Sequence, residues 1–169
     1  AYSAGEKAAI VIYLNRNAFN GLCRYSKKGL FNTPFGRYKT VYFPEVELRN
    51  IYTKCKDYTF WVTSFENIMQ SSKENDVIYV DPPYVPLNDT AYFTAYTKES
   101  FGPDEQKLLA ELAENSKSRV IISNHDTAFT RELYKNADKI IELSVTRSIS
   151  AKADSRKKVK ELLAIYKGA

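Results

Sequence analysis

The pattern of apolar and polar positions divides the 169-residue chain into two parts that predict different kinds of structure. In the first part, a capping-box spacing before an apolar run predicts a helix over residues 6–19. Pro44 predicts the start of a second helix that ends near Lys56. Between these helices, the stretch 22–32 predicts a β-hairpin, and the tip of this hairpin is basic.

The second part alternates between strand-like and helix-like patterns. Apolar and β-branched runs predict strands over residues 58–62, 77–80, 119–123 and 139–145. Amphipathic stretches predict helices over residues 103–115 and 127–136, while residues 161–166 fit either a helix or a strand. This alternation predicts an α/β sheet whose strands are mostly parallel.

The stretch Asp81-Pro82-Pro83-Tyr84 directly follows the strand over residues 77–80, which is apolar enough to be fully buried. The two prolines end the strand, because they lack backbone donors and restrict the backbone. Asp81 and Tyr84 are therefore held at the carboxyl end of a strand, where open α/β sheets bind ligands. The Asp81 carboxylate and the Pro82 carbonyl can accept hydrogen bonds from an exocyclic amine, and Tyr84 offers a face for stacking a base. The alternative is a strand, a proline turn and a surface tyrosine.

Composition narrows the classes of protein that fit. Charged residues make up 27% and aromatic residues 14% of the chain, which excludes a disordered protein. The net charge of +5 and the pI of about 9.0 modestly favour a polyanionic partner. Two cysteines without a C-x-x-C spacing and a single histidine predict neither a zinc site nor another multi-histidine metal site, and they fit a reducing cytoplasm. No apolar run is long enough to predict a membrane span.

The segment over residues 16–39 interleaves cations with aromatic and amide side chains. Cations attract phosphates, arginine and asparagine read guanine and adenine, and aromatic rings stack on bases or wedge between them. On this pattern alone, a solvated hairpin with aromatic side chains packed beneath it is about equally favoured. The cations are Arg16, Arg24, Lys27, Lys28, Arg37 and Lys39, and the other side chains are Asn17, Phe19, Asn20, Tyr25, Phe31 and Tyr38.

The D-P-P-Y stretch resembles the motif of amino-methyltransferases that act on DNA adenine, and the surrounding chain resembles the Dam family, which methylates adenine in GATC. The resemblance also includes residues 14–25, Phe35-Gly36-Arg37-Tyr38 and Ser123-Asn124-His125-Asp126. It implies part of a Rossmann-like sheet dependent on S-adenosylmethionine, with a helical and β-hairpin DNA-recognition region. If residues 161–166 form a strand, the resemblance also implies that they make an antiparallel ribbon with residues 139–145 at the edge of the sheet. The implied division is a target-recognition region over residues 1–56 and a catalytic portion over 57–169. The implied partner is double-stranded DNA in a bacterial or phage-infected cytoplasm, with no metal.

The resemblance also implies roles for particular residues. Asp81, Pro82 and Tyr84 would be catalytic, and Ser64, Phe65 and Asp81 would contact the cofactor. A helix cap and a core aromatic are at least as well favoured for Ser64 and Phe65. Phe19 occupies the position of a tyrosine that wedges into the duplex in the enteric member. The residues implied to contact DNA are Phe19, Asn20, Leu22, Arg24, Lys27, Lys28, Pro34, Tyr38, Asn88 and Arg147.

The glycine-rich loop of the family is missing from this sequence. No two of the six glycines form G-x-G, and the family's tryptophan-glycine-glycine lysine segment is also absent. We therefore expect these residues to correspond to the carboxyl-terminal portion of the family and not to methylate DNA by themselves. Two alternatives stay open: a sequence-specific DNA-binding module without catalysis, and a protein methyltransferase acting on a glutamine amide. The basic hairpin argues against the second.

Overall fold

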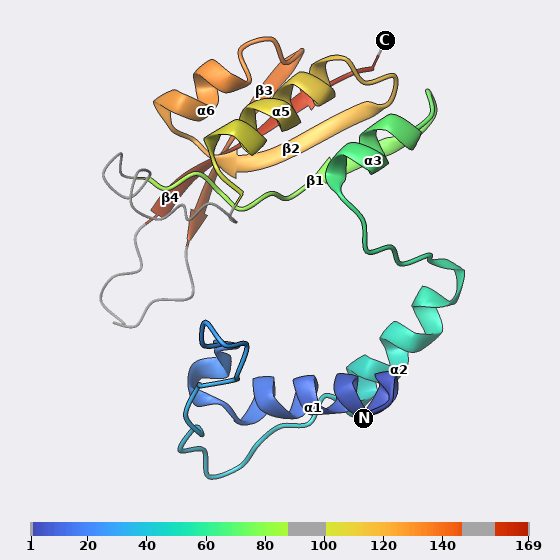
Figure 1. Cartoon of the computed structure of the whole chain (residues 1–169). Coiled ribbons are helices and arrows are strands. Elements are labelled where there is room, and N and C mark those ends of the chain that lie inside the picture. The colour runs from blue at the N-terminus through green and yellow to red at the C-terminus, as the bar shows by residue number, and fades with distance from the viewer. Residues whose placement is uncertain (1, 88–100, 147–157, 169) are drawn as a thin grey trace. The chain divides into compact units, whose positions relative to one another are not determined.

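The computed structural model describes residues 2–87, 101–146 and 158–168. The chain divides into two compact units, residues 1–60 and residues 61–169 (Figure 1). None of the helices in the described ranges is long and apolar enough to cross a membrane.

The first unit is built from helices and turns. Helix α1 spans Ala4–Asn17 and begins with the predicted capping box, in which the Glu6 carboxylate accepts the Ser3 backbone N–H at 2.7 Å. A 3-10 turn, η1, spans Phe19–Gly21, helix α2 spans Glu45–Lys54, and a second 3-10 turn, η2, spans Cys55–Asp57. Both predicted helices are confirmed.

The stretch predicted as a hairpin reverses direction over a short distance. A single antiparallel bridge joins Tyr25 to Phe31, and the Ser26 N–H donates to the Leu30 carbonyl at 2.8 Å. The two bridge rings meet edge to face at 5.6 Å. Because only one bridge forms, the reversal is shorter than the predicted hairpin.

The second unit is a four-stranded sheet with helices packed on it (Figure 1). The strands are β1 (Val77–Val80), β2 (Arg119–His125), β3 (Lys139–Thr146) and β4 (Lys158–Tyr166), in the spatial order β1-β2-β4-β3. The helices are α3 (Phe65–Ser71), α5 (Pro103–Glu114) and α6 (Ala128–Leu133). Helices α5 and α6 lie over the same face of the sheet.

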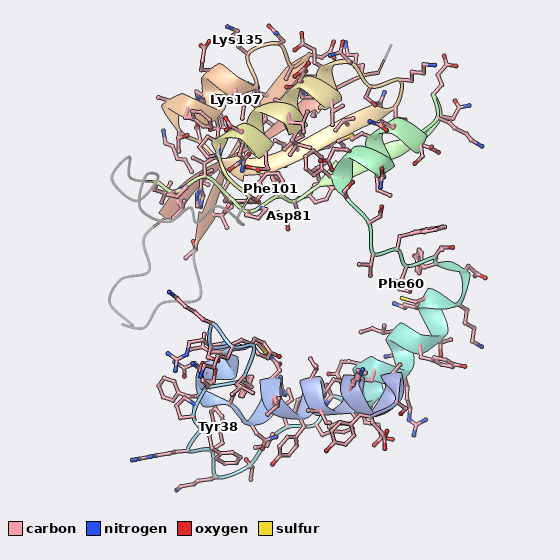
Figure 2. All side chains as sticks on the ribbon, in the orientation of Figure 1. Tyr38, Phe60, Asp81, Phe101, Lys107 and Lys135 are labelled. Carbon is pink, nitrogen blue, oxygen red and sulfur yellow. The ribbon has the colours of Figure 1, made fainter. Side chains whose placement is uncertain are left out.

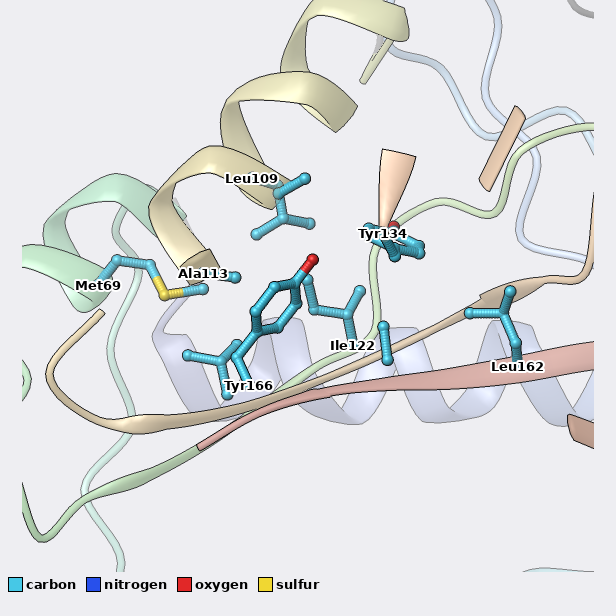
Figure 3. Close-up of a cluster of buried hydrophobic side chains, with 10 residues drawn as sticks. Met69, Leu109, Ala113, Ile122, Tyr134, Leu162 and Tyr166 are labelled. Carbon is cyan, nitrogen blue, oxygen red and sulfur yellow. The ribbon is translucent and has the colours of Figure 1, made fainter. Parts of the chain in front are cut away.

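The core of the second unit lies between α5 and the sheet (Figure 3). Apolar side chains recur on α5 every three to four residues and face the middle of β2 and β4. The fully buried members have no solvent exposure at all: Leu109, Ala113, Val120, Ile122, Tyr134, Leu162 and Ala164. This core holds the carboxyl ends of β1 and β2 in place.

The prediction of a mostly parallel sheet was wrong for the described strands. Only β1 and β2 pair in parallel, whereas β4 runs antiparallel to both of its neighbours, β2 and β3. Residues 161–166, which fitted a helix or a strand, lie in β4, and the antiparallel ribbon with residues 139–145 that the resemblance implies is confirmed. Apolar periodicity identifies a strand but carries no information about the direction of its partner, and that is why this error arose.

Two further strand predictions need correction. Residues 58–62 form no strand; Phe60, Trp61 and Val62 are all at least 75% exposed, and no described strand pairs with this stretch. An isolated extended segment without a ladder partner leaves its backbone groups to water. Strand β1 is also not fully buried, because Val77 and Tyr79 are more than 60% exposed on one face while Ile78 and Val80 pack against the core.

Candidate functional site

The Asp81–Tyr84 loop begins where β1 ends, beside the carboxyl end of β2 (Figure 2). In the parallel pairing Val80 lies opposite Ile122, so that Ser123 comes next to Asp81. The buried Ser123 hydroxyl lies 3.0 Å from Asp81 Oδ1 and 3.3 Å from the Val80 carbonyl. A hydroxyl has one proton, so it donates to one of these acceptors at a time. Asp81 itself is exposed and is therefore accessible to a ligand.

Tyr84 is half-buried and rests on His125. The two rings meet edge to face, 5.0 Å apart and at an interplanar angle of 83°. Burial raises the pKa of Tyr84; a hydrogen bond to Ser123 opposes this rise, and the negative charges of Asp81 and Glu161 add to it. The phenol is therefore neutral at physiological pH, which suits a stacking surface beside a carboxylate.

The cofactor candidates Ser64 and Phe65 both have structural roles. Ser64 caps α3 by accepting the Asn67 N–H at 3.4 Å, and the Phe65 ring packs edge to face on Phe101 at 5.5 Å. The alternative of a helix cap and a core aromatic is thus realised in the fold. A cofactor contact by the same side chains is compatible with it, since Ser64 stays exposed.

One observation next to these residues fits a ligand with hydrogen-bond donors. The Oε2 atom of Glu66 is buried and has no hydrogen-bond partner. A buried acceptor without a donor is costly, and a ribose hydroxyl or an amino group would satisfy it. The described residues contain no group of three or more His, Cys, Asp or Glu side chains that could hold a metal ion.

Several predicted DNA contacts come together around η1 in the first unit, where Figure 2 labels Tyr38. The Phe19 N–H donates to the Pro34 carbonyl at 2.9 Å, and the Tyr38 hydroxyl accepts the Asn20 N–H at 2.9 Å. Gly36 makes this arrangement possible, because a Cβ there would collide with the Tyr38 ring. Asn20 adopts a φ of 53°, a left-handed conformation that asparagine tolerates better than most residues.

A hollow of about 390 Å³ adjoins this turn, and its lining includes Arg16, Asn20, Tyr38 and Tyr42. Arg16 lies over the Tyr42 ring at 5.5 Å and donates from Nε to the Tyr42 carbonyl at 2.9 Å. The surface is therefore both cationic and aromatic. Phe19, Leu22 and Tyr38 are each 44–50% exposed and are accessible to a partner.

Arg24, Lys27 and Lys28 lie on the short reversal, and all three are exposed. Arg24 donates from Nε to Asn32 Oδ1 at 2.9 Å and from Nη2 to the Asn32 carbonyl at 3.0 Å. These two bonds use two of the five N–H donors of a guanidinium and orient its plane. Two predicted DNA contacts, Asn88 and Arg147, lie outside the described residues.

Comparison with known proteins shows to which family the chain belongs. Residues 2–149 match the family described as D12 class N6 adenine-specific DNA methyltransferase. The chain belongs to this family.

The relatives of this chain include three bacterial proteins that are named DNA adenine methylase. The chain is 50% identical over 164 residues to that of Salmonella typhi, 49% over 165 to that of Escherichia coli K12, and 47% over 165 to that of Haemophilus influenzae. These alignments cover 95–96% of this chain but only 57–59% of the relatives. The resemblance inferred from the D-P-P-Y stretch and its surroundings is confirmed, while the assigned roles of individual residues stay predictions.

Sequence reasoning missed Gln106, and it noted Asn124 only as part of the Ser123-Asn124-His125-Asp126 stretch, without its contact to the chain after Tyr84. Gln106 on α5 and Asn124 on β2 are both fully buried and contact the backbone of residues 83–85. Gln106 did leave a signal in the sequence. It lies three, four and seven residues before Leu109, Ala110 and Ala113, and so it occupies the buried face of an amphipathic helix.

Proposed function

We propose that this chain forms the target-binding part of a DNA adenine methyltransferase. In the proposed reaction a methyl group moves from S-adenosylmethionine to the exocyclic amine of adenine in double-stranded DNA, within GATC. The observation that carries the proposal is the Asp81–Tyr84 loop. In a D12 family chain, this loop places the exposed Asp81 carboxylate and the half-buried Tyr84 ring together at the carboxyl end of β1, with the buried Pro82 between them.

The target amine is the group that these residues would handle. Asp81 and the Pro82 carbonyl accept its two N–H bonds, and this turns the nitrogen lone pair away from the loop. As the amine attacks, positive charge develops on nitrogen, and the Asp81 carboxylate stabilises that charge. Ser123 holds one carboxylate oxygen, so the carboxylate does not need to reorient during the reaction.

Tyr84 supplies a stacking face for the flipped adenine, and His125 supports the ring from its edge. When bound, S-adenosylmethionine supplies an electrophilic methyl group. Ser64, Phe65 and the unpaired Glu66 oxygen are the residues that would contact it. The relatives are bacterial, and we propose a bacterial cytoplasm as the site of action.

Recognition of GATC would belong to the first unit. Arg24 would pair with a guanine, since its oriented guanidinium matches the two acceptors on that base. Phe19, Leu22, Pro34 and Tyr38 would lie against bases or backbone, and Lys27 and Lys28 would contact phosphates. The net charge of +5 supports a polyanionic partner.

The first experiment uses the 169-residue chain as it stands. Because the loop supplies only the target side of the reaction, we expect duplex binding but no methyl transfer. A binding titration with a GATC duplex measures duplex binding, calorimetry with S-adenosylmethionine measures cofactor binding, and a tritium-transfer assay on the same duplex measures methyl transfer. Micromolar cofactor binding together with turnover would show that the site is complete within these residues.

The decisive experiment grafts this chain in place of the matching segment of the Escherichia coli relative. We expect this grafted methylase to methylate GATC duplexes and to leave duplexes without GATC unmodified. A graft that binds duplex and cofactor but transfers no methyl group would instead favour the non-catalytic DNA-binding module, which the basic reversal around Lys27 and Lys28 also fits.

A further inference from the structure

The backbone of the Asp81–Tyr84 loop is anchored by two buried side chains. Gln106 donates from Nε2 to the Pro83 carbonyl at 2.7 Å, and Asn124 Oδ1 accepts the Val85 N–H at 2.9 Å. Neither side chain has any solvent exposure. We call Gln106 and Asn124 the amide pair, because Asn124 Nδ2 also donates to Gln106 Oε1 at 3.1 Å.

We propose that the amide pair positions this loop for methyl transfer, an inference that rests on the proposed function. The loop has few ways to be held, because two of its four residues are prolines without an N–H. Its anchoring must therefore come through carbonyls and through the N–H of the next residue, Val85. Those are the groups that the amide pair binds.

The hydrogen bonds also determine which way both amides face. Asn124 Oδ1 accepts two backbone N–H groups, from Val85 and His125, while its Nδ2 donates to Gln106 and to the Tyr134 hydroxyl at 3.0 Å. All four hydrogen bonds that an asparagine side chain can make are thereby used. The reverse orientation would direct an NH₂ group at two N–H donors, so only one arrangement is stable in this buried site.

Elements far apart in the sequence meet at this point. Gln106 comes from α5 and Asn124 from β2, and both bind the chain that follows β1. Tyr134, at the end of α6, contacts the amide pair and not the loop. Burial raises the pKa of Tyr134 to about 12, so its hydroxyl stays protonated across the physiological range. The hydrogen bond between Asn124 and the Tyr134 hydroxyl is therefore unaffected by pH near neutrality.

The pair bears on the reaction through the Pro82 carbonyl and Asp81. Gln106 occupies the Pro83 carbonyl, which leaves the Pro82 carbonyl as the one proposed to accept the target amine. The carbonyls of Pro82 and Pro83 are neighbours on a backbone that the proline rings restrict. A hydrogen bond that holds the Pro83 carbonyl therefore also limits the direction of the Pro82 carbonyl. A misplacement of about 1 Å between reacting groups costs roughly 100-fold in rate. Gln106 and Asn124 are thus positioning residues rather than groups that touch the substrate.

The test changes Gln106→Met in the grafted methylase, because methionine has a similar volume and lacks the N–H donor. We expect kcat to fall about 10–100-fold, while the Kd for a GATC duplex stays within about twofold. Leu109→Val on the same helix is the control, since it disturbs the core without touching the loop. We expect it to lower thermal stability yet to leave kcat within about twofold.

A second measurement needs no catalysis and uses the 169-residue chain itself. Hydrogen exchange at the Val85 N–H should be about tenfold faster in Gln106→Met than in Leu109→Val at matched stability. Equal kcat in Gln106→Met and Leu109→Val, or equal exchange rates, would overturn the positioning role while the proposed function stands. A native graft without methylation, together with faster exchange in Gln106→Met, would overturn the proposed function and leave the anchoring of the loop intact.

Discussion

The two units of this chain differ in how they are held together. Among the described residues of the first unit only Ala18 and Gly36 are buried, and neither α1 nor α2 has a buried residue. The second unit encloses a continuous apolar core between α5 and the sheet. The proposed chemistry lies on the unit with a core, and the proposed reading of DNA lies on the unit without one.

This difference has a physical consequence for each task. Methyl transfer needs groups held to within fractions of an ångström, and a close-packed core transmits such constraints. The first unit is instead held by polar contacts such as the Tyr38 hydroxyl donating to the Ala18 carbonyl at 3.2 Å. It leaves aromatic side chains exposed, with Tyr52 and Phe60 each more than 70% accessible. We expect it to adjust its shape when it meets a duplex.

The largest expected effect is that of Asp81→Ala in the grafted methylase. Removing the carboxylate should abolish methyl transfer, a loss of at least about 10⁴-fold or roughly 5.4 kcal/mol of barrier. Binding to a GATC duplex should stay within about threefold, because Asp81 acts on the amine and not on phosphates. Tritium transfer and a binding titration measure the two effects, and the exposed Glu74→Ala is the control. Methyl transfer near the native rate in Asp81→Ala would show that Asp81 is not needed for the reaction.

The difference in packing can be tested with two isoleucines. Ile122→Ala creates a cavity at a fully buried position and should lower the free energy of unfolding of the second unit by about 2–5 kcal/mol. Ile51→Ala on α2, where the side chain is 56% exposed, should change stability by no more than about 0.5 kcal/mol. Denaturant unfolding of both variants of the chain gives the comparison. Similar losses in the two would mean that the first unit has a core after all.

A smaller effect is expected for Arg24→Ala, which tests whether the first unit reads sequence. Losing a two-bond contact to guanine should cost about 1–3 kcal/mol of discrimination at one base pair. Lys27→Ala and Lys28→Ala should weaken binding to all duplexes alike and reduce its salt dependence. Competition binding with GATC and singly substituted duplexes measures both. If Arg24→Ala weakens every duplex equally, Arg24 contacts only phosphate.

The smallest effect concerns an ion pair at the end of β2. Arg131 donates to both oxygens of Asp126, at 2.6 and 2.8 Å, and these hydrogen bonds lower the pKa of Asp126. A lowered pKa in the folded state stabilises the protein above about pH 4, where an unfolded aspartate is ionised. This stabilisation disappears as the pH falls through the lowered value.

Arg131→Leu should therefore lose about 1–2 kcal/mol of stability at pH 7, and this difference from the native chain should shrink as the pH falls below about 4. Lys135→Leu breaks an exposed ion pair with Glu132 and should cost no more than about 0.5 kcal/mol. Thermal unfolding across pH 2–7 follows both variants. If the stability lost in Arg131→Leu does not depend on pH, the loss comes from packing of the aliphatic part of the arginine and not from its ion pair with Asp126.

Local sequence determined helices α1, α2, α5 and α6 and the position of the motif, whereas α3 (Phe65–Ser71) was not among the predicted helices. The capping box at Ser3 and Glu6, Pro103 at the start of α5 and the two prolines after β1 act through their own backbones, so no distant contact is needed to predict them. The motif resemblance likewise identified the family. These features depend on residues within a few positions of one another.

Tertiary structure decided what depends on partners far along the chain. Whether β4 runs antiparallel between β2 and β3, and whether residues 58–62 form a strand at all, depends on which backbone lies alongside. The same holds for the amide pair, in which Gln106 meets the carbonyl of Pro83, 23 residues away, and Asn124 meets the N–H of Val85, 39 residues away. A polar residue on a buried helix face shows that a partner is required, but only the folded chain shows which partner it is.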